Sequence, residues 1–257
     1  MLLLKKERII MELKTSNKTM IITGSSRGIG KAIALSFAKR GHNLVILSKN
    51  SSNELLQTKQ EIENYGCQCL SLIGDVADPT FAERVISETL NKFSSIDCLI
   101  NNAGISHIGL MSDMTLEEWN TILQTNLSSI FYFSRLVVPH MVSRQQGSII
   151  NISSIWGEVG ASCEVAYSAT KGGMNAFTKA LAKELAPSNI SVNAISCGAI
   201  ATKMNEWLSD EETQTLIDEI PASRLGTPEE IGEIAYHLSE MTPYLTGQII
   251  RVDGGLI

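Results

Sequence analysis

Short apolar runs alternate with amphipathic stretches along most of the chain. The runs are rich in Ile, Val and Leu with little polar alternation, which is typical of parallel strands covered on both faces. The predicted strands are TMIITG, NLVILS, CLSLIGD, CLINNAG, GSIINIS, ISVNAISC and GQIIRVDG, at residues 19–24, 43–48, 69–75, 98–104, 147–153, 190–197 and 247–254.

The stretches between these runs carry apolar residues at helical spacing and predict helices over 30–41, 53–65, 79–93, 115–143 and 164–186. Strands and helices that alternate in this way indicate the α/β class, with a single Rossmann-like, doubly wound parallel sheet and helices on both faces. We expect residues 1–17 to form a loose N-terminal extension and residues 18–257 to form one domain. The weaker pattern over 198–226 predicts a small helical lid over the substrate.

Composition and charge argue against several classes of function. The 257 residues are 44% hydrophobic and 19% charged, with a formal net charge of −6, so no basic surplus indicates nucleic acid or an anionic membrane. No window reaches the roughly 18 apolar residues that a membrane span needs. The five scattered cysteines, without a secretory signal, predict reduced thiols in a cytoplasmic protein. Cys67 and Cys69 lack partners at zinc-ligand spacing, so we expect no metal site.

The segment TGSSRGIG, residues 23–30, joins the first predicted strand to the first helix. At such a junction, backbone amides and the positive end of the helix face the carboxyl edge of the sheet, where anions bind. Its glycines, Gly24, Gly28 and Gly30, follow the spacing G-x-x-x-G-x-G instead of G-x-G-x-x-G. A glycine-rich turn without a ligand is the alternative, but the position favours the pyrophosphate of a dinucleotide.

The end of the second predicted strand indicates which dinucleotide binds. NAD-binding chains usually carry an acidic residue there for the ribose 2′-hydroxyl, whereas this strand ends in Ser48 and Lys49. Lys49 and, from the glycine loop, Arg27 could attract a 2′-phosphate. The alternative is that both are ordinary surface charges. We therefore expect NADP(H) as the cofactor, and equally efficient turnover of NADH would contradict this.

Further motifs follow in order along the chain: GDV at 74–76, NNAG at 101–104, Asn126 in TNL, Ser154 in NISS and YSATK at 167–171. Together with the glycine loop, they make the chain resemble the short-chain dehydrogenases/reductases over residues 18–257. The resemblance implies an oxidoreductase in which a nicotinamide cofactor and a carbonyl or alcohol exchange a hydride.

The residues themselves fit this chemistry. Tyr167 and Lys171 are four positions apart and would share one face of a helix. A phenol has a pKa of about 10, and a neighbouring ammonium lowers it, so Tyr167 could exchange a proton with the substrate oxygen. The Ser154 hydroxyl could polarise the substrate carbonyl, and its spacing to Tyr167 favours it over Ser153. Asn126 resembles the residue that anchors a water-linked proton relay to the lysine.

By the same resemblance, further segments contact the cofactor. Asp75 and Val76 match an adenine-contacting pair, and SCGAIAT matches a segment that meets the nicotinamide amide, with Cys197 where the family usually has proline. The family also implies a homotetramer. The expected cofactor contacts are Gly24, Ser26, Arg27, Gly28, Ile29, Gly30, Ser48, Lys49, Asp75, Val76, Asn102, Ala103, Gly104, Tyr167, Lys171, Gly198, Ile200 and Thr202.

Two resemblances indicate different ketone substrates. RLGTPEEI and TGQIIRVDGG resemble bacterial 3-oxoacyl-acyl-carrier-protein reductases, which reduce a β-keto thioester with NADPH. The positions that match their two basic carrier-docking residues are Gln145 and Ser188, neither of them basic. NISSIWGEVGASCEVAYSATKGG resembles elongation factor P 5-aminopentanone reductases, and there Glu164 could pair with a substrate amine or simply favour a helix start.

The substrate is thus expected to be a small-molecule, carrier-linked or protein-linked ketone. A non-catalytic NADP(H) sensor is the alternative from another class of function. The intact Ser154, Tyr167 and Lys171 argue against it, since a sensor has no need of them.

Overall fold

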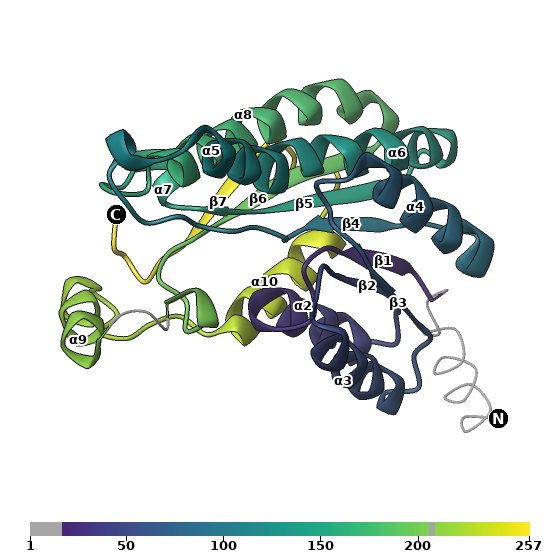
Figure 1. The fold of residues 1–257 in the computed structure, drawn as a ribbon. Helices are drawn as coiled ribbons and strands as arrows, with labels where there is room; N and C mark the ends of the chain where they lie inside the picture. Colours follow the sequence, from purple (N-terminus) through teal and green to yellow (C-terminus); the bar gives the residue numbers. More distant parts are fainter. Residues whose placement is uncertain (1–16, 206–208) are drawn as a thin grey trace.

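The computed structural model describes residues 17–205 and 209–257, which contain one seven-stranded parallel sheet between layers of helices (Figure 1). The strand order is β3-β2-β1-β4-β5-β6-β7, so the chain starts in the middle, runs to one edge and then crosses to the other. The predicted fold class is confirmed. The strands are β1 Thr19–Ile22, β2 Asn43–Ser48, β3 Cys69–Ile73, β4 Cys98–Asn101, β5 Gly147–Ser154, β6 Ile190–Cys197 and β7 Ile249–Val252.

Each face of the sheet is covered by helices. In Figure 1, α2, α3 and α10 lie on one face, and α4, α5, α6 and α8 lie on the other. Met20 and Ile22 of β1 pack into the core beside α2, whereas Ile21 packs into the core beside α4 and α6. Because both faces are buried, the strands are mostly apolar. The buried polar residues of β5 and β6, such as Asn151 and Asn193, have hydrogen-bond partners. The helices are α2 Gly28–Ala38, α3 Ser52–Asn64, α4 Pro79–Phe93, α5 Leu116–Leu123, α6 Ser129–Arg144, α7 Trp156–Val159, α8 Val165–Leu185, α9 Asp210–Glu219 and α10 Pro228–Glu240.

The long helix predicted over 115–143 is not a regular α-helix. Between α5 and α6 the backbone takes a wider π turn over Gln124–Ser128. The side chain of Asn126 in this turn is fully buried. Turns of this kind are frequent at functional sites. The apolar pattern could not reveal it, because helical spacing continues on either side.

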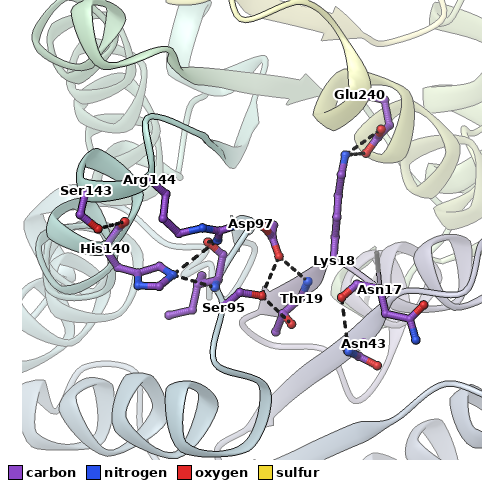
Figure 2. Close-up of polar contacts among 11 residues, drawn as sticks. Asn17, Lys18, Thr19, Asn43, Ser95, Asp97, His140, Ser143, Arg144 and Glu240 are labelled. Atoms are coloured by element: carbon purple, nitrogen blue, oxygen red, sulfur yellow. Dashed lines mark hydrogen bonds and ion pairs between the residues drawn. The ribbon is translucent and has the colours of Figure 1, made fainter. Parts of the chain in front are cut away.

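At the edge of the sheet where the strands begin, Asp97 connects neighbouring elements (Figure 2). Its carboxylate accepts the Thr19 backbone N–H at 2.8 Å and pairs with the Arg144 guanidinium at 2.8 Å. Lys18, just before β1, pairs with Glu240 at the end of α10, 2.6 Å away. These contacts tie β1, α6 and α10 together at this edge. The loops at the opposite, carboxyl edge are the ones that bind ligands in open α/β sheets.

The segment predicted as a lid, residues 198–226, forms a loop closed at its base. Ile200 and Gly226 make an isolated parallel bridge, and Ala201 N–H donates to the Gly226 carbonyl at 2.9 Å. The loop contains a 3₁₀ turn over Lys203–Asn205 and the helix α9. All residues of α9 lie in the described part of the chain, and none of them is buried. Residues 206–208 lie outside the described residues. The predicted N-terminal extension, residues 1–17, also lies outside the described residues, except for Asn17.

Three findings concern membrane spans, metal-binding clusters and cysteines. Across 17–205 and 209–257, no helix combines the length and the apolar composition that crossing a bilayer demands. In the same two ranges, no three His, Cys, Asp or Glu side chains converge in the way that a metal ion would need. All five cysteines are free thiols.

Candidate active site

The predicted catalytic serine and tyrosine meet at the carboxyl end of β5. Ser154 is the last residue of that strand, and Tyr167 lies in the first turn of α8. The Ser154 hydroxyl lies close enough to the Tyr167 phenol to lower the pKa of that phenol by hydrogen bonding. Ser153 turns the other way and donates to the Asn175 side chain at 2.7 Å. The fold therefore brings Ser154, and not Ser153, against the tyrosine.

Lys171 lies one turn after Tyr167 on α8 and is 3% exposed. Its ammonium donates to the Ile152 carbonyl at 2.7 Å and lies 5.5 Å from the centre of the Tyr167 ring. Burial lowers the pKa of this lysine to about 8, because the charged form loses its hydration. The lysine is thus held beside the tyrosine by a backbone acceptor on β5.

The pKa of Tyr167 differs from the sequence-based expectation. A neighbouring ammonium was predicted to lower it, but burial raises it, and the hydrogen bond with Ser154 opposes this shift without reversing it. The physical reason is that removing the phenol from water penalises the phenolate, while the Lys171 ammonium is directed at Ile152. Tyr167 is therefore neutral at physiological pH and can donate a proton.

Asn126, from the π turn, holds the loop that follows β4. Its side-chain oxygen accepts the Ile105 N–H at 2.9 Å, and its amide donates to the Ile105 carbonyl at 2.8 Å and to the Thr170 hydroxyl at 3.2 Å. The side chains of Asn126 and Lys171 both border Gly104. The asparagine and the lysine are thus neighbours, as the family resemblance implies.

The glycine loop is folded tightly against the end of β4. Asn102 donates its side-chain amide to the Gly24 carbonyl at 2.9 Å. A methyl group on Gly30 would lie 2.3 Å from the same carbonyl oxygen, so only glycine fits there. All residues of helix α2 lie in the described part of the chain, and the helix begins at Gly28. Arg27 makes no side-chain capping hydrogen bond, and the first turn of α2 contains no acidic residue. Its first amides are therefore open to an anion, which fits a dinucleotide pyrophosphate.

The two cations predicted to bind a 2′-phosphate are each paired with a carboxylate. Arg27 lies 3.2 Å from Glu54 of α3, and Lys49 lies 2.6 Å from Asp75. Both cationic side chains are more than half exposed, at 55% and 59%. Asp75, the predicted adenine contact, is thus also the partner of Lys49. These groups gather near the carboxyl ends of β2 and β3, where the adenosine ribose binds in this fold class.

The remaining predicted contacts lie along the same edge. Gly198 donates its N–H to the Val252 carbonyl at 2.9 Å, which fixes the loop after β6 although Cys197 replaces the usual proline. Burial raises the pKa of the Cys197 thiol to about 12, so it stays neutral and acts as a packing residue. Thr202 lies beside the glycine loop. A methyl group added to Gly28 would be 3.6 Å from the side-chain methyl group of Thr202.

The other members of the predicted set have these surroundings. The Ser48 hydroxyl donates to that of Ser26 at 3.4 Å, which links the end of β2 to the glycine loop. Val76 is buried, and Ala103 donates its N–H to the Thr23 hydroxyl at 2.9 Å. Ile29 packs against the core beside α2. The predicted cofactor residues therefore form one continuous border along the carboxyl edge.

A cavity of about 350 Å³ lies beside the loop that Asn126 holds, and its lining comprises Ile105, Ser106, His107, Thr115, Glu117, Glu118, Thr121 and Ile122. Ile105, whose backbone is bonded to Asn126, connects the cavity with the catalytic group. At this wall the Ser106 hydroxyl donates to the Glu164 carboxylate. The cavity therefore combines apolar side chains with carboxylates, and could receive a substrate that has a polar or cationic end.

Sequence reasoning did not identify Glu54, Lys203 or Ser106 at this edge. Glu54 pairs with Lys203 at 3.2 Å, although 149 residues separate them. Ser106 and Glu164 are 58 residues apart. No local spacing can signal such pairs, because only the folded chain brings them together.

Comparison with known proteins agrees with this geometry. The family model described as short chain dehydrogenase matches residues 18–213. The chain is 39% identical over 241 residues to the uncharacterized oxidoreductase YmfI of Bacillus subtilis strain 168, covering 93% of this chain and 98% of the relative. It is 37% identical over 240 residues to the 3-oxoacyl-[acyl-carrier-protein] reductase FabG of Staphylococcus aureus strain Mu50, covering 93% and 98%.

Among solved structures, a candidate short-chain alcohol dehydrogenase from Sinorhizobium meliloti 1021 matches with a TM-score of 0.89 and 33% identity, covering 95% of this chain and 98% of the other. The matches extend over nearly the whole chain, and they confirm the resemblance expected from the sequence motifs. The chain belongs to the short-chain dehydrogenase/reductase family of oxidoreductases.

Proposed function

We propose that the protein is an NADPH-dependent ketoreductase that reduces a ketone to a secondary alcohol. The observation that carries the proposal is the proximity of the Ser154 hydroxyl, the Tyr167 phenol and the buried Lys171 at the carboxyl end of β5. A bound nicotinamide cofactor would supply the hydride. Ser154 would donate to the carbonyl oxygen and hold it, and Tyr167 would give its proton to the same oxygen as negative charge develops there. Lys171 would stabilise the phenolate that Tyr167 leaves behind.

The choice of NADPH is supported by charge at the end of β2. That strand ends in Ser48, where an NAD-binding chain would carry a carboxylate. Lys49 directly follows Ser48, and Arg27 directly follows Ser26, whose hydroxyl accepts from that of Ser48. Both cations are therefore near this position and can bind phosphate oxygens. A 2′-phosphate would therefore meet two cations, each of which has a carboxylate partner, Glu54 or Asp75, that the phosphate would have to displace.

The first candidate substrate is a 3-oxoacyl thioester, supported by the relatives named 3-oxoacyl-[acyl-carrier-protein] reductase. A carrier protein is acidic and needs free cations to dock. At the position that matches one docking site, Gln145 is neutral and exposed. Its neighbour Arg144 is engaged by Asp97 at 2.8 Å and by the Ile96 carbonyl at 3.4 Å. The chain could therefore reduce the thioester with weak carrier docking.

A second candidate, favoured by the lining of the cavity, is a ketone that carries an amine, such as the 5-aminopentanone group on elongation factor P. Glu117 and Glu118 line the cavity, and Ser106 at its wall donates to the Glu164 carboxylate. Carboxylates near the reacting centre would attract an ammonium and repel an anionic acyl carrier. Assembly as a homotetramer and a cytoplasmic location stay predictions.

The test of the reaction is oxidation of NADPH in the presence of acetoacetyl-coenzyme A and of a 5-aminopentanone-modified elongation factor P. We expect turnover with at least one ketone, and a roughly 10²- to 10⁴-fold lower rate for Tyr167→Phe, which removes the proton donor. Tyr244→Phe is the matched control, because Tyr244 is 96% exposed and should behave as the wild type. NADPH binding without turnover of any ketone would instead favour the sensor. The preferred ketone decides between the two substrates.

A further inference from the structure

Glu54 lies between the glycine loop and the segment that follows β6. Its Oε2 atom is 3.2 Å from Arg27 Nη1, and its Oε1 atom is 3.2 Å from Lys203 Nζ. The three side chains come from α3, from the residue before α2 and from the 3₁₀ turn after β6. One carboxylate thus joins cations from two separate segments that border the predicted cofactor.

The start of α3 is held directly on the cofactor loop. Thr58, one turn after Glu54, donates its hydroxyl to the Ser26 carbonyl at 3.2 Å. The backbone N–H of Ser51, just before α3, donates to the Ser48 hydroxyl at 3.3 Å. Glu54 is therefore fixed beside the end of β2, the point at which this fold class distinguishes a 2′-hydroxyl from a 2′-phosphate.

The Glu54 carboxylate is ionised at neutral pH. The hydrogen bond from Lys203 is the main cause that holds its pKa below the usual range, with smaller contributions from Ser51 and Arg27. Its side chain is 34% exposed, so the carboxylate can turn toward water when another anion takes its partners. A phosphate on Arg27 would nevertheless remain close to this negative charge, because α3 is fixed.

We propose that Glu54 is a cofactor-specificity residue that competes with the cofactor's 2′-phosphate for Arg27 and Lys203. Lys203 is then a further cation of the phosphate site, supplied by the segment after β6. The inference rests on the proposed use of NADP(H). The carboxylate and the phosphate are both anions that need the same N–H donors, and they repel each other when they are neighbours. Glu54 therefore weakens the binding of the phosphorylated cofactor and leaves a 2′-hydroxyl unaffected.

The test uses two probes that lack nicotinamide, 2′,5′-ADP and 5′-AMP, with binding to the full-length protein measured by calorimetry. For Glu54→Gln we expect roughly threefold to tenfold tighter binding of 2′,5′-ADP and no change for 5′-AMP, since an exposed charge contributes at this scale. Lys203→Met should bind 2′,5′-ADP roughly threefold more weakly. Glu61→Gln is the matched control, because Glu61 lies on the same helix and pairs with Lys31 at 2.8 Å.

The two proposals fail in different ways. If the wild type binds 2′,5′-ADP no more tightly than 5′-AMP, the proposed NADPH preference is wrong. If the wild type prefers 2′,5′-ADP but Glu54→Gln leaves the affinity for 2′,5′-ADP unchanged or lowers it, the proposal that Glu54 competes with the phosphate is wrong. Glu54 then only positions Arg27. An equal gain for both probes, or the same gain in Glu61→Gln, would also overturn the inference. Circular dichroism verifies that each variant is folded.

Discussion

Replacing Lys171 with methionine should abolish activity and yet stabilise the protein. The lysine is 3% exposed, and burial lowers its pKa from the ordinary 10.5 to about 8. This shift corresponds to about 3 kcal/mol of unfavourable charging in the folded state. Methionine fills a similar volume without a charge. It loses the hydrogen bond to the Ile152 carbonyl, which offsets about 1 kcal/mol of the gain.

The stability that Lys171→Met gains should depend on pH in a predictable direction. The unfolded chain keeps the lysine proton up to about pH 10.5, whereas the folded chain loses it near pH 8. Between these values the unfolded state binds more protons, so the stability of the wild type rises with pH, and below pH 8 the full penalty is present. The advantage of Lys171→Met should therefore be complete at pH 7 and should shrink as the pH rises from 8 toward 10.5.

The assay is urea unfolding followed by circular dichroism at pH 7 and at pH 9.5, at one fixed protein concentration because assembly contributes to stability. We expect the variant to be about 1–3 kcal/mol more stable at pH 7, or roughly 3–8 °C in melting temperature for a chain of this length. Lys179→Met on the same helix is the control, because Lys179 is exposed. A variant that is less stable at pH 7, or whose advantage is equal at both pH values, would refute the burial argument.

Two further predictions concern the serine pair and the glycine loop. Ser154→Ala should reduce kcat/KM roughly 10²- to 10³-fold without unfolding the protein. Ser153→Ala should keep activity but lose about 1–2 kcal/mol of stability, since Asn175 loses its buried partner; the reverse pattern would contradict the assignment. Gly30→Ala should abolish binding of 2′,5′-ADP, because its methyl would lie 2.3 Å from the Gly24 oxygen, and tight calorimetric binding by a folded variant would show that the loop can adapt.

The sequence predicts the sheet well for a simple physical reason. Strands buried on both faces must be mostly apolar, and the structure places β2 and β6 at the residues expected, 43–48 and 190–197. The π turn was not predicted, because a change of hydrogen-bond register leaves the apolar spacing of α5 and α6 almost unaltered. The strand ends were slightly overestimated, since residues such as Asn102 belong to the loops that carry function.

The candidate site was predictable as a set of residues, but its electrostatics were not. Motif order located Ser154, Tyr167 and Lys171, and the fold brings them together. The direction of the Tyr167 pKa shift depends on how completely the ring is buried and on where the Lys171 ammonium points. The four-residue spacing between Tyr167 and Lys171 reveals neither. In the same way, the pairing of Glu54 with Lys203 depends on two loops that meet only in three dimensions.

The electrostatics of the site bear on the direction of the reaction. A buried, neutral Tyr167 is ready to give a proton but poorly suited to take one, because the phenolate needed for that is penalised by burial. During reduction the carbonyl oxygen becomes an alkoxide, a far stronger base than a phenolate, so the transfer from Tyr167 is favourable. Oxidation of an alcohol would require the phenolate first, and burial of the ring keeps the population of that phenolate small at neutral pH. For the proposed reaction we therefore expect neutral pH to favour ketone reduction, and raising the pH should increase the rate of alcohol oxidation relative to ketone reduction.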